Sequence, residues 1–82
     1  MQIQVKYFAA IREALGSGET IDSQAKTLGA LRDELITRSE VYAQALSRGK
    51  AVRVALNQVM QDESAVLSAG CEVAFFPPVT GG

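Results

Sequence analysis

The chain has 82 residues, 48% of them apolar and 21% charged, which predicts a single folded domain with a modest core rather than a disordered chain. Eight basic and nine acidic residues leave a formal net charge of -1, which argues against a nucleic-acid-binding protein that depends on a basic face. The sequence contains no histidine, which excludes Ser-His-Asp and Cys-His catalytic sites and histidine-ligated metal sites.

The first part of the chain is predicted to form a strand, a short helix and a second strand. Residues 2–7 alternate between polar and apolar, as in a half-buried strand. Residues 9–15 fit a short helix that Gly16 ends. Residues 19–23 fit a short polar strand centred on Ile21, which we expect to pair with the first strand.

Two helices are predicted in the middle of the chain. Thr27 can cap a helix in which apolar residues recur at helical spacing between positions 28 and 36. Arg38 is expected in the last turn of this helix, where a cation interacts favourably with the helix dipole. Ser39 is expected to cap a second, shorter helix that Gly49 ends.

Three strands are predicted in the last third. They cover residues 52–56, residues 59–60 after a turn at Asn57 and Gln58, and residues 71–76 after Gly70. Helices that cross one face of a small mixed sheet give an α+β architecture. Periodicity alone does not distinguish a β-grasp from a ferredoxin-like split βαβ fold.

Side-chain parity predicts an exposed apolar patch near the end of the last strand. If Val73 and Phe75 face the helices, Phe76 faces away from them, because side chains alternate along a strand. Phe8 falls on the same outer side, and Met60 has no evident place in the core. Exposed apolar patches usually mark partner sites, so these three residues are a predicted partner interface. The predicted polar rim consists of Arg12 and Arg53.

A stiff tail with a slim tip is predicted after this strand. Pro77 and Pro78 have no N–H and fix φ, and the β-branched Val79 and Thr80 also favour an extended chain. Gly81-Gly82 follows, and two residues without side chains can place a carboxylate in a narrow cleft. The tail can reach roughly 20 Å at ~3.3 Å per residue.

Residues 72–82, EVAFFPPVTGG, resemble the C-terminus of the small, sulfur-carrying subunit of molybdopterin synthase. Earlier segments of the chain also match this family, more weakly, and occur in the same order as in the family. They are Tyr7-Phe8-Ala9, Arg12-Glu13, Leu31-Arg32, Gly49-Lys50 and Asn57-Gln58. The resemblance therefore covers essentially the whole chain. It implies a ubiquitin-like β-grasp domain over residues 1–76, with helices packed on one face of a mixed sheet, and a flexible C-terminal Gly-Gly tail over residues 77–82.

The resemblance also implies a chemical role for the tail. Gly82 is expected to be adenylated by a ubiquitin-activating-like partner that uses ATP, and then to become a thiocarboxylate. The thiocarboxylate is expected to donate sulfur, inside the large subunit, to the dithiolene of molybdopterin. Gly81 and residues 77–80 are expected to insert the tip, and Phe8, Met60 and Phe76 match positions through which the family docks its partners. The catalytic groups are expected in the large subunit, so this chain is expected to bind no cofactor and not to be an enzyme.

Other functions remain open from the sequence. A sulfur carrier for thiamin thiazole synthesis and a ubiquitin-like protein modifier share the fold and the Gly-Gly end. An interaction domain with an inert tail is a third alternative, and a self-contained enzyme is disfavoured because no histidine or cofactor motif is present. Cys71 is the only cysteine and has no basic neighbour, which favours a structural thiol. With no signal peptide and no ~20-residue apolar span, a cytoplasmic protein is expected.

Overall fold

The computed structural model describes residues 1–77, which form a five-stranded mixed sheet and three helices. In chain order the elements are β1 (Gln2–Tyr7), α1 (Ala9–Leu15), β2 (Gly18–Asp22), α2 (Leu28–Ile36), α3 (Glu40–Leu46), β3 (Arg53–Leu56), β4 (Val59–Gln61) and β5 (Glu72–Phe76). The strand order is β2-β1-β5-β3-β4, with β5 parallel to β1 and antiparallel to β3. This arrangement confirms the β-grasp expectation.

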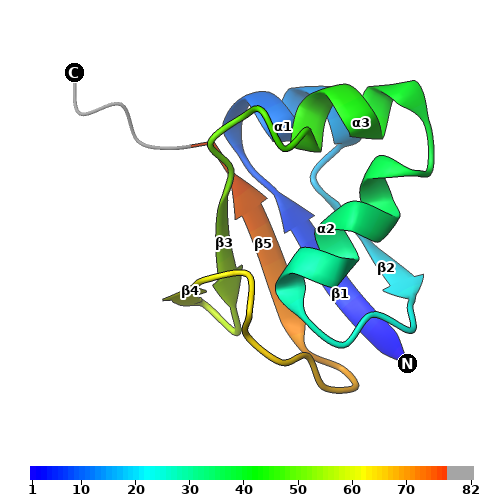
Figure 1. The fold of residues 1–82 in the computed structure, drawn as a ribbon, viewed down its shortest axis with the longest axis vertical. Helices are drawn as coiled ribbons and strands as arrows, with labels where there is room; N and C mark the ends of the chain where they lie inside the picture. The colour runs from blue at the N-terminus through cyan, green and yellow to red at the C-terminus, as the bar shows by residue number, and fades with distance from the viewer. Residues whose placement is uncertain (78–82) are drawn as a thin grey trace.

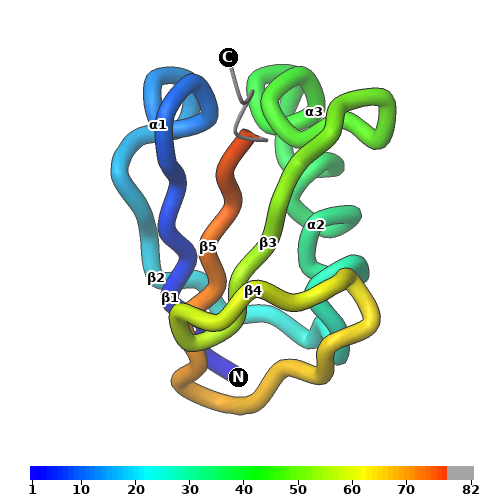
Figure 2. Tube along the Cα trace, turned by 90° about the vertical axis from the view of Figure 1, so that its left-hand side faces the viewer, coloured from blue at the N-terminus to red at the C-terminus, as the bar shows by residue number. Residues whose placement is uncertain are grey.

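The helices cover one face of the sheet (Figure 1). α2 crosses that face, while α1 and α3 lie at the end of the sheet where β5 finishes, as Figure 2 shows from the side. Among the described residues, no helix is long and apolar enough to cross a membrane.

The core lies between the sheet and the helices. Residues of β1 alternate strictly, with Ile3, Val5 and Tyr7 at most 1% exposed, and Val73 and Phe75 of β5 are fully buried. The rings of Tyr7 and Phe75 stack with their centroids 6.3 Å apart. α2 contributes Leu28, Leu31 and Leu35, each fully buried. The predicted alternation is therefore confirmed in β1, and in β5 Val73 and Phe75 are buried as predicted, although Ala74 between them is buried as well.

Several local signals also behave as predicted. The Thr27 side chain accepts a hydrogen bond from the Ala30 N–H at 3.1 Å and caps α2. Gly16 ends α1 with φ of 94°, a conformation that glycine adopts without steric cost. Asn57 and Gln58 have φ of 50° and 68°, as the tight turn between β3 and β4 requires.

Three expectations about the helix ends are wrong. α2 ends at Ile36, so Arg38 lies beyond its last turn and donates a hydrogen bond to Glu19 at 2.7 Å instead. Ser39 is the N-cap residue of α3, but its side chain makes no capping hydrogen bond. α3 ends at Leu46, before Gly49, because the chain turns there to place the Leu46 and Ser47 carbonyls around Arg32. Strand boundaries also differ from the predicted ones by a residue at some ends.

Candidate partner-docking site at the tail root

The central strand of the sheet leads directly to the predicted tail. β5 lies between β1 and β3 and ends at Phe76, and Pro77 is the last described residue. We call Phe76 and Pro77 the tail root (Figure 1). The other predicted tail residues, Pro78, Val79, Thr80, Gly81 and Gly82, lie outside the described residues. Phe76 pairs with Arg53 of β3, and the pairing of β5 with β1 ends one residue earlier, at Phe75.

An aromatic pair lies on the outer face of the sheet at this root. The Phe8 and Phe76 rings meet edge to face, with centroids 6.2 Å apart and an interplanar angle of 86°. The Phe8 N–H donates to the Phe75 carbonyl at 3.1 Å, which fixes the chain where β1 ends. Ala9 then turns with φ of 54°, the left-handed region, so the chain enters α1 while Phe8 stays 45% exposed.

Met60 extends this apolar surface across the sheet. Ala55 of β3 is opposite both Ala74 of β5 and Met60 of β4, and directly opposed residues share a face. Met60 is 52% exposed, whereas the small side chains of Ala55 and Ala74 are covered. We call Phe8, Ala55, Met60, Ala74 and Phe76 the outer patch. The structure thus brings the three predicted interface residues to one face, with two alanines between them.

Cations without an acidic partner lie near the tail root. Arg53 is directly opposite Phe76 in the sheet, and Arg12 lines the same surface recess as Phe8. Within residues 1–77, neither has an acidic group within 4.0 Å, and the same holds for Lys50. Both residues of the predicted rim are exposed and available to a partner.

A second apolar surface lies on the helix side of the tail root. A groove of about 460 Å³ runs between α1, α3 and the segment before β3. Its apolar lining includes Ile11, Ala14, Val41, Ala45, Val52 and Pro77, with Lys50 at the rim. We call it the helix groove. The sequence analysis did not predict this groove. Its only signal in the sequence is the i, i+4 pair Val41 and Ala45, and such spacing is equally typical of a helix face that packs on a core.

A polar cluster, also not predicted, holds β2 against α3. Glu19 accepts hydrogen bonds from the hydroxyls of Tyr7 at 2.8 Å and Tyr42 at 2.7 Å, and from Arg38 at 2.7 Å. Burial by itself would raise the pKa of Glu19, but the hydrogen bonds from Tyr42, Arg38 and Tyr7 lower it overall. Burial, and then the bond to Glu19, raise the pKa of Tyr7. Glu19 is therefore ionised with its oxygens hydrogen-bonded, and the cluster has a structural role.

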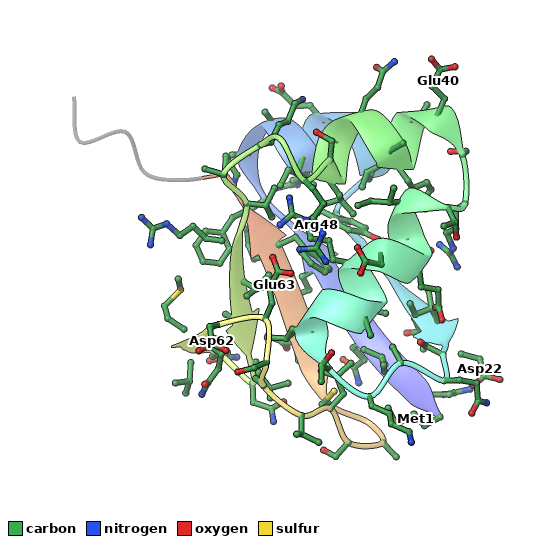
Figure 3. The ribbon with its side chains drawn as sticks, in the orientation of Figure 1. Met1, Asp22, Glu40, Arg48, Asp62 and Glu63 are labelled. Atoms are coloured by element: carbon green, nitrogen blue, oxygen red, sulfur yellow. The ribbon has the colours of Figure 1, made fainter. Side chains whose placement is uncertain are left out.

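A buried arginine fixes the loop beside the helix groove. Arg32 is 4% exposed and donates to the carbonyls of Leu46, Ser47 and Lys50 and to the Glu63 carboxylate, at 2.6 to 3.2 Å. Arg48 binds the other oxygen of Glu63, and Figure 3 shows these two side chains pointing toward one another. These bonds set the path of the chain from α3 to β3.

Chemistry within the described residues is limited. Residues 1–77 contain no group of three acidic, cysteine or histidine side chains placed to hold a metal ion. Cys71 is 4% exposed, before β5 and at the opposite end of that strand from the tail root. Burial in an apolar core is typical of a structural thiol.

Comparisons with known proteins agree with this geometry. Residues 5–82 match the model of the ThiS family. The molybdopterin synthase sulfur carrier subunit of Escherichia coli K12 is 42% identical over 81 residues, covering 98% of this chain and 99% of that protein. A complex of subunits 1 and 2 of molybdopterin-converting factor from Helicobacter pylori contains a chain with a TM-score of 0.70 and 29% identity, each chain covered completely. The H. volcanii small archaeal modifier protein 1 has a TM-score of 0.73 and 26% identity, over 95% of this chain and 98% of that one.

Proposed function

The chain belongs to the ThiS family, and we propose that it carries sulfur for the synthesis of molybdopterin, with the carboxylate of Gly82 as the site of attachment. The observation that carries this proposal is the arrangement at the tail root. The central strand of the sheet continues into the Pro-Pro-Val-Thr-Gly-Gly segment, beside an exposed patch built on Phe8, Met60 and Phe76.

The proposed chemistry begins with activation, because a carboxylate is a poor electrophile. The Gly82 carboxylate attacks ATP held by an adenylating partner, releasing pyrophosphate and leaving an acyl-adenylate. Hydrogen sulfide, or a donor that delivers it, then attacks the acyl carbon and displaces AMP, and the product is a thiocarboxylate. Donation of that sulfur to the pterin precursor, with water restoring the oxygen, returns Gly82 to a carboxylate. The chain itself supplies position and no catalytic group.

The proposed partner for the donation step is a large catalytic subunit. The solved Helicobacter pylori complex, in which a chain like this one occurs with a second subunit, supports this pairing. The outer patch would dock the partner, and residues 77–80 would set how far Gly81 and Gly82 reach into it. We place these steps in the cytoplasm, in keeping with a single cysteine that has no partner for an internal disulfide.

The mass of the native protein tests the proposed attachment. Replacement of one terminal oxygen by sulfur raises the intact mass by the difference between the two atoms, and mild hydrolysis reverses the change. Conjugates of this chain to lysines of other proteins, with no thiocarboxylate form, would instead support the modifier alternative. An unmodified mass in cells that make molybdopterin would contradict both.

Substitution of Gly81 tests the slim tip. Gly81→Ile places a β-branched side chain in the segment that must enter a narrow channel, so we expect sulfur transfer to be lost. The melting temperature should be unchanged, because the core residues identified above all lie between Ile3 and Phe75. Single-turnover sulfur transfer to the large subunit and circular dichroism measure the two effects. Full transfer by Gly81→Ile would exclude a narrow channel.

A further inference from the structure

The helix groove has no role in the function proposed above. We propose that it is a second half of the docking surface, which receives an apolar side chain of the large subunit while Lys50 binds a carboxylate of the same segment. This inference rests on the proposed function, because it names a further contact of the same partner. The outer patch and the helix groove would then be contacted together.

The groove is both apolar and open. Ile11 and Ala45 are 4% and 9% exposed and form its floor, whereas Val41 is 52% exposed on its wall. Val41 belongs to α3, and the groove is lined by residues of α1 and α3. Figure 2 shows these two helices on either side of the end of β5. An apolar side chain entering here would cover Val41 and remove apolar surface from water, which is the main favourable term in association.

The groove is continuous with the tail root. Pro77 lines the groove, while Phe76, one residue earlier, contacts Phe8 on the outer face. Successive residues of an extended chain point to opposite sides, so the root separates the two apolar surfaces. A partner that encloses the chain from Pro77 onward must contact both sides. Enclosure is needed because water would hydrolyse the thiocarboxylate before its sulfur reaches the precursor.

The charge at the rim indicates what accompanies the apolar side chain. Among the described residues that line the groove, Lys50 alone is charged, and it is exposed. Its carbonyl accepts a hydrogen bond from Arg32 at 3.2 Å, so its backbone is fixed beside the groove. An exposed cation at the edge of an apolar surface fits a partner carboxylate, which orients docking more than it adds affinity.

The same charge argues against a second copy of this chain as the occupant. A two-fold dimer packed groove to groove would use the same surface on both copies and bring the two Lys50 side chains together. The groove offers no acidic residue to separate them. Like charges across an interface are unfavourable, so a different protein with an acidic residue fits better.

Two matched pairs of variants test the inference by calorimetric titration of the full chain with its large subunit. Val41→Asp should weaken binding about tenfold, the size typical of a central interface contact. The control is Val66→Asp, since Val66 is also exposed, at 73%, and lies outside the groove. Val66→Asp should bind as the wild type does. Thermal melts of both variants show that each is folded.

The second pair tests the charge. Lys50→Glu should weaken binding by a factor that shrinks as salt concentration rises, because exposed charges are screened. Lys26→Glu makes the same charge change at an exposed lysine away from the groove and should have little effect. The other polar side chain of the groove lining, Gln44, is the same in Lys50→Glu and Lys26→Glu, so the two variants differ from each other only at the lysines.

Wild-type affinity in both Val41→Asp and Lys50→Glu would overturn the inference. The proposed function would survive that result if Phe76→Ala still weakened binding and the thiocarboxylate still formed. Concentration-dependent dimerisation of the wild type that Val41→Asp abolishes, with unchanged binding to the large subunit, would also overturn it and assign the groove to a second copy. Absence of any binding by the wild type would instead contradict the proposed function.

Discussion

One carboxylate illustrates how single residues hold this small domain together. Glu19 lies on β2, an edge strand with little apolar surface, and it accepts hydrogen bonds from Tyr7 in β1, Tyr42 in α3 and Arg38. The Arg38 guanidinium also lies 5.3 Å from the centroid of the Tyr42 ring, within the range of a cation–π contact. A charged acceptor with three donors is stronger than neutral pairs would be.

We expect Glu19→Gln to lower the free energy of unfolding at neutral pH by about 1–3 kcal/mol, because an amide cannot satisfy all three donors. The pKa of Glu19 is lower in the folded chain, so its contribution is present above the ordinary glutamate pKa and is lost as pH falls through the folded-state pKa. The difference between wild type and variant should therefore shrink in acid. Urea unfolding at neutral and acidic pH measures it. A constant difference across that range would contradict a role for the charge.

At the scale of the elements, β5 divides its side chains between two tasks. Val73 and Phe75 are buried under the helices, whereas Phe76 turns outward to Phe8. The alternation was predictable because it depends only on the geometry of a strand. The burial of Ala74 could not be predicted in the same way. Ala74 is buried because β1 and β3 lie on either side of β5, and local sequence does not reveal the strand order.

Substitutions in β5 separate the two tasks. Phe75→Ala should lower the free energy of unfolding by about 3–5 kcal/mol, since it leaves a cavity in the core. Phe76→Ala should cost clearly less stability, and should weaken binding of the large subunit by about 1–3 kcal/mol if Phe76 is an anchor. Thermal melts and calorimetric titration of both variants decide this. Equal melting temperatures together with normal binding by Phe76→Ala would place the anchor elsewhere.

Helix ends were harder to predict than helix positions. Apolar spacing located α2, but the Thr37 hydroxyl donates to the Glu34 carbonyl at 2.6 Å and ends the helix before Arg38. Arg38 then finds its partner on β2, far away in the sequence. The helix groove could not be predicted from the sequence for a similar reason, because it depends on how far apart α1 and α3 lie in the fold. The spacing of apolar residues predicts where a helix or strand lies, whereas contacts between elements decide where it ends and which grooves form beside it.

At the scale of the whole molecule, the outer patch and the single thiol lie at opposite ends of the sheet. The outer patch and the tail root lie at one end of β5, and Cys71 is buried before the other end. The polar clusters around Glu19 and Arg32 are satisfied within the described fold, where no buried side-chain polar atom lacks a hydrogen-bond partner. Such a domain presents a surface for recognition, which agrees with the proposal that its partners carry out the reactions.

The thiol provides a test of this division. Cys71→Ser should keep most of its sulfur-transfer capacity, because Cys71 is 4% exposed and at the opposite end of β5 from the tail root, although burying a hydroxyl should lower stability slightly. The measurement is a single turnover after loading by the activating partner, with folding checked by circular dichroism. Loss of transfer in a folded Cys71→Ser would mean that sulfur passes through the thiol as a persulfide.

The central place of β5 also has a mechanical consequence. A pull on the tail acts along a strand that is bonded to β1 on one side and to β3 on the other. Load applied along such a strand falls on both hydrogen-bond ladders at once, in shear, whereas an edge strand would peel away one bond at a time. When the tail is withdrawn from a tight channel, both ladders of the domain therefore resist the pull together. A carrier that is used repeatedly must have its tail inserted and withdrawn many times. In this domain the strand that takes the force is paired on both sides.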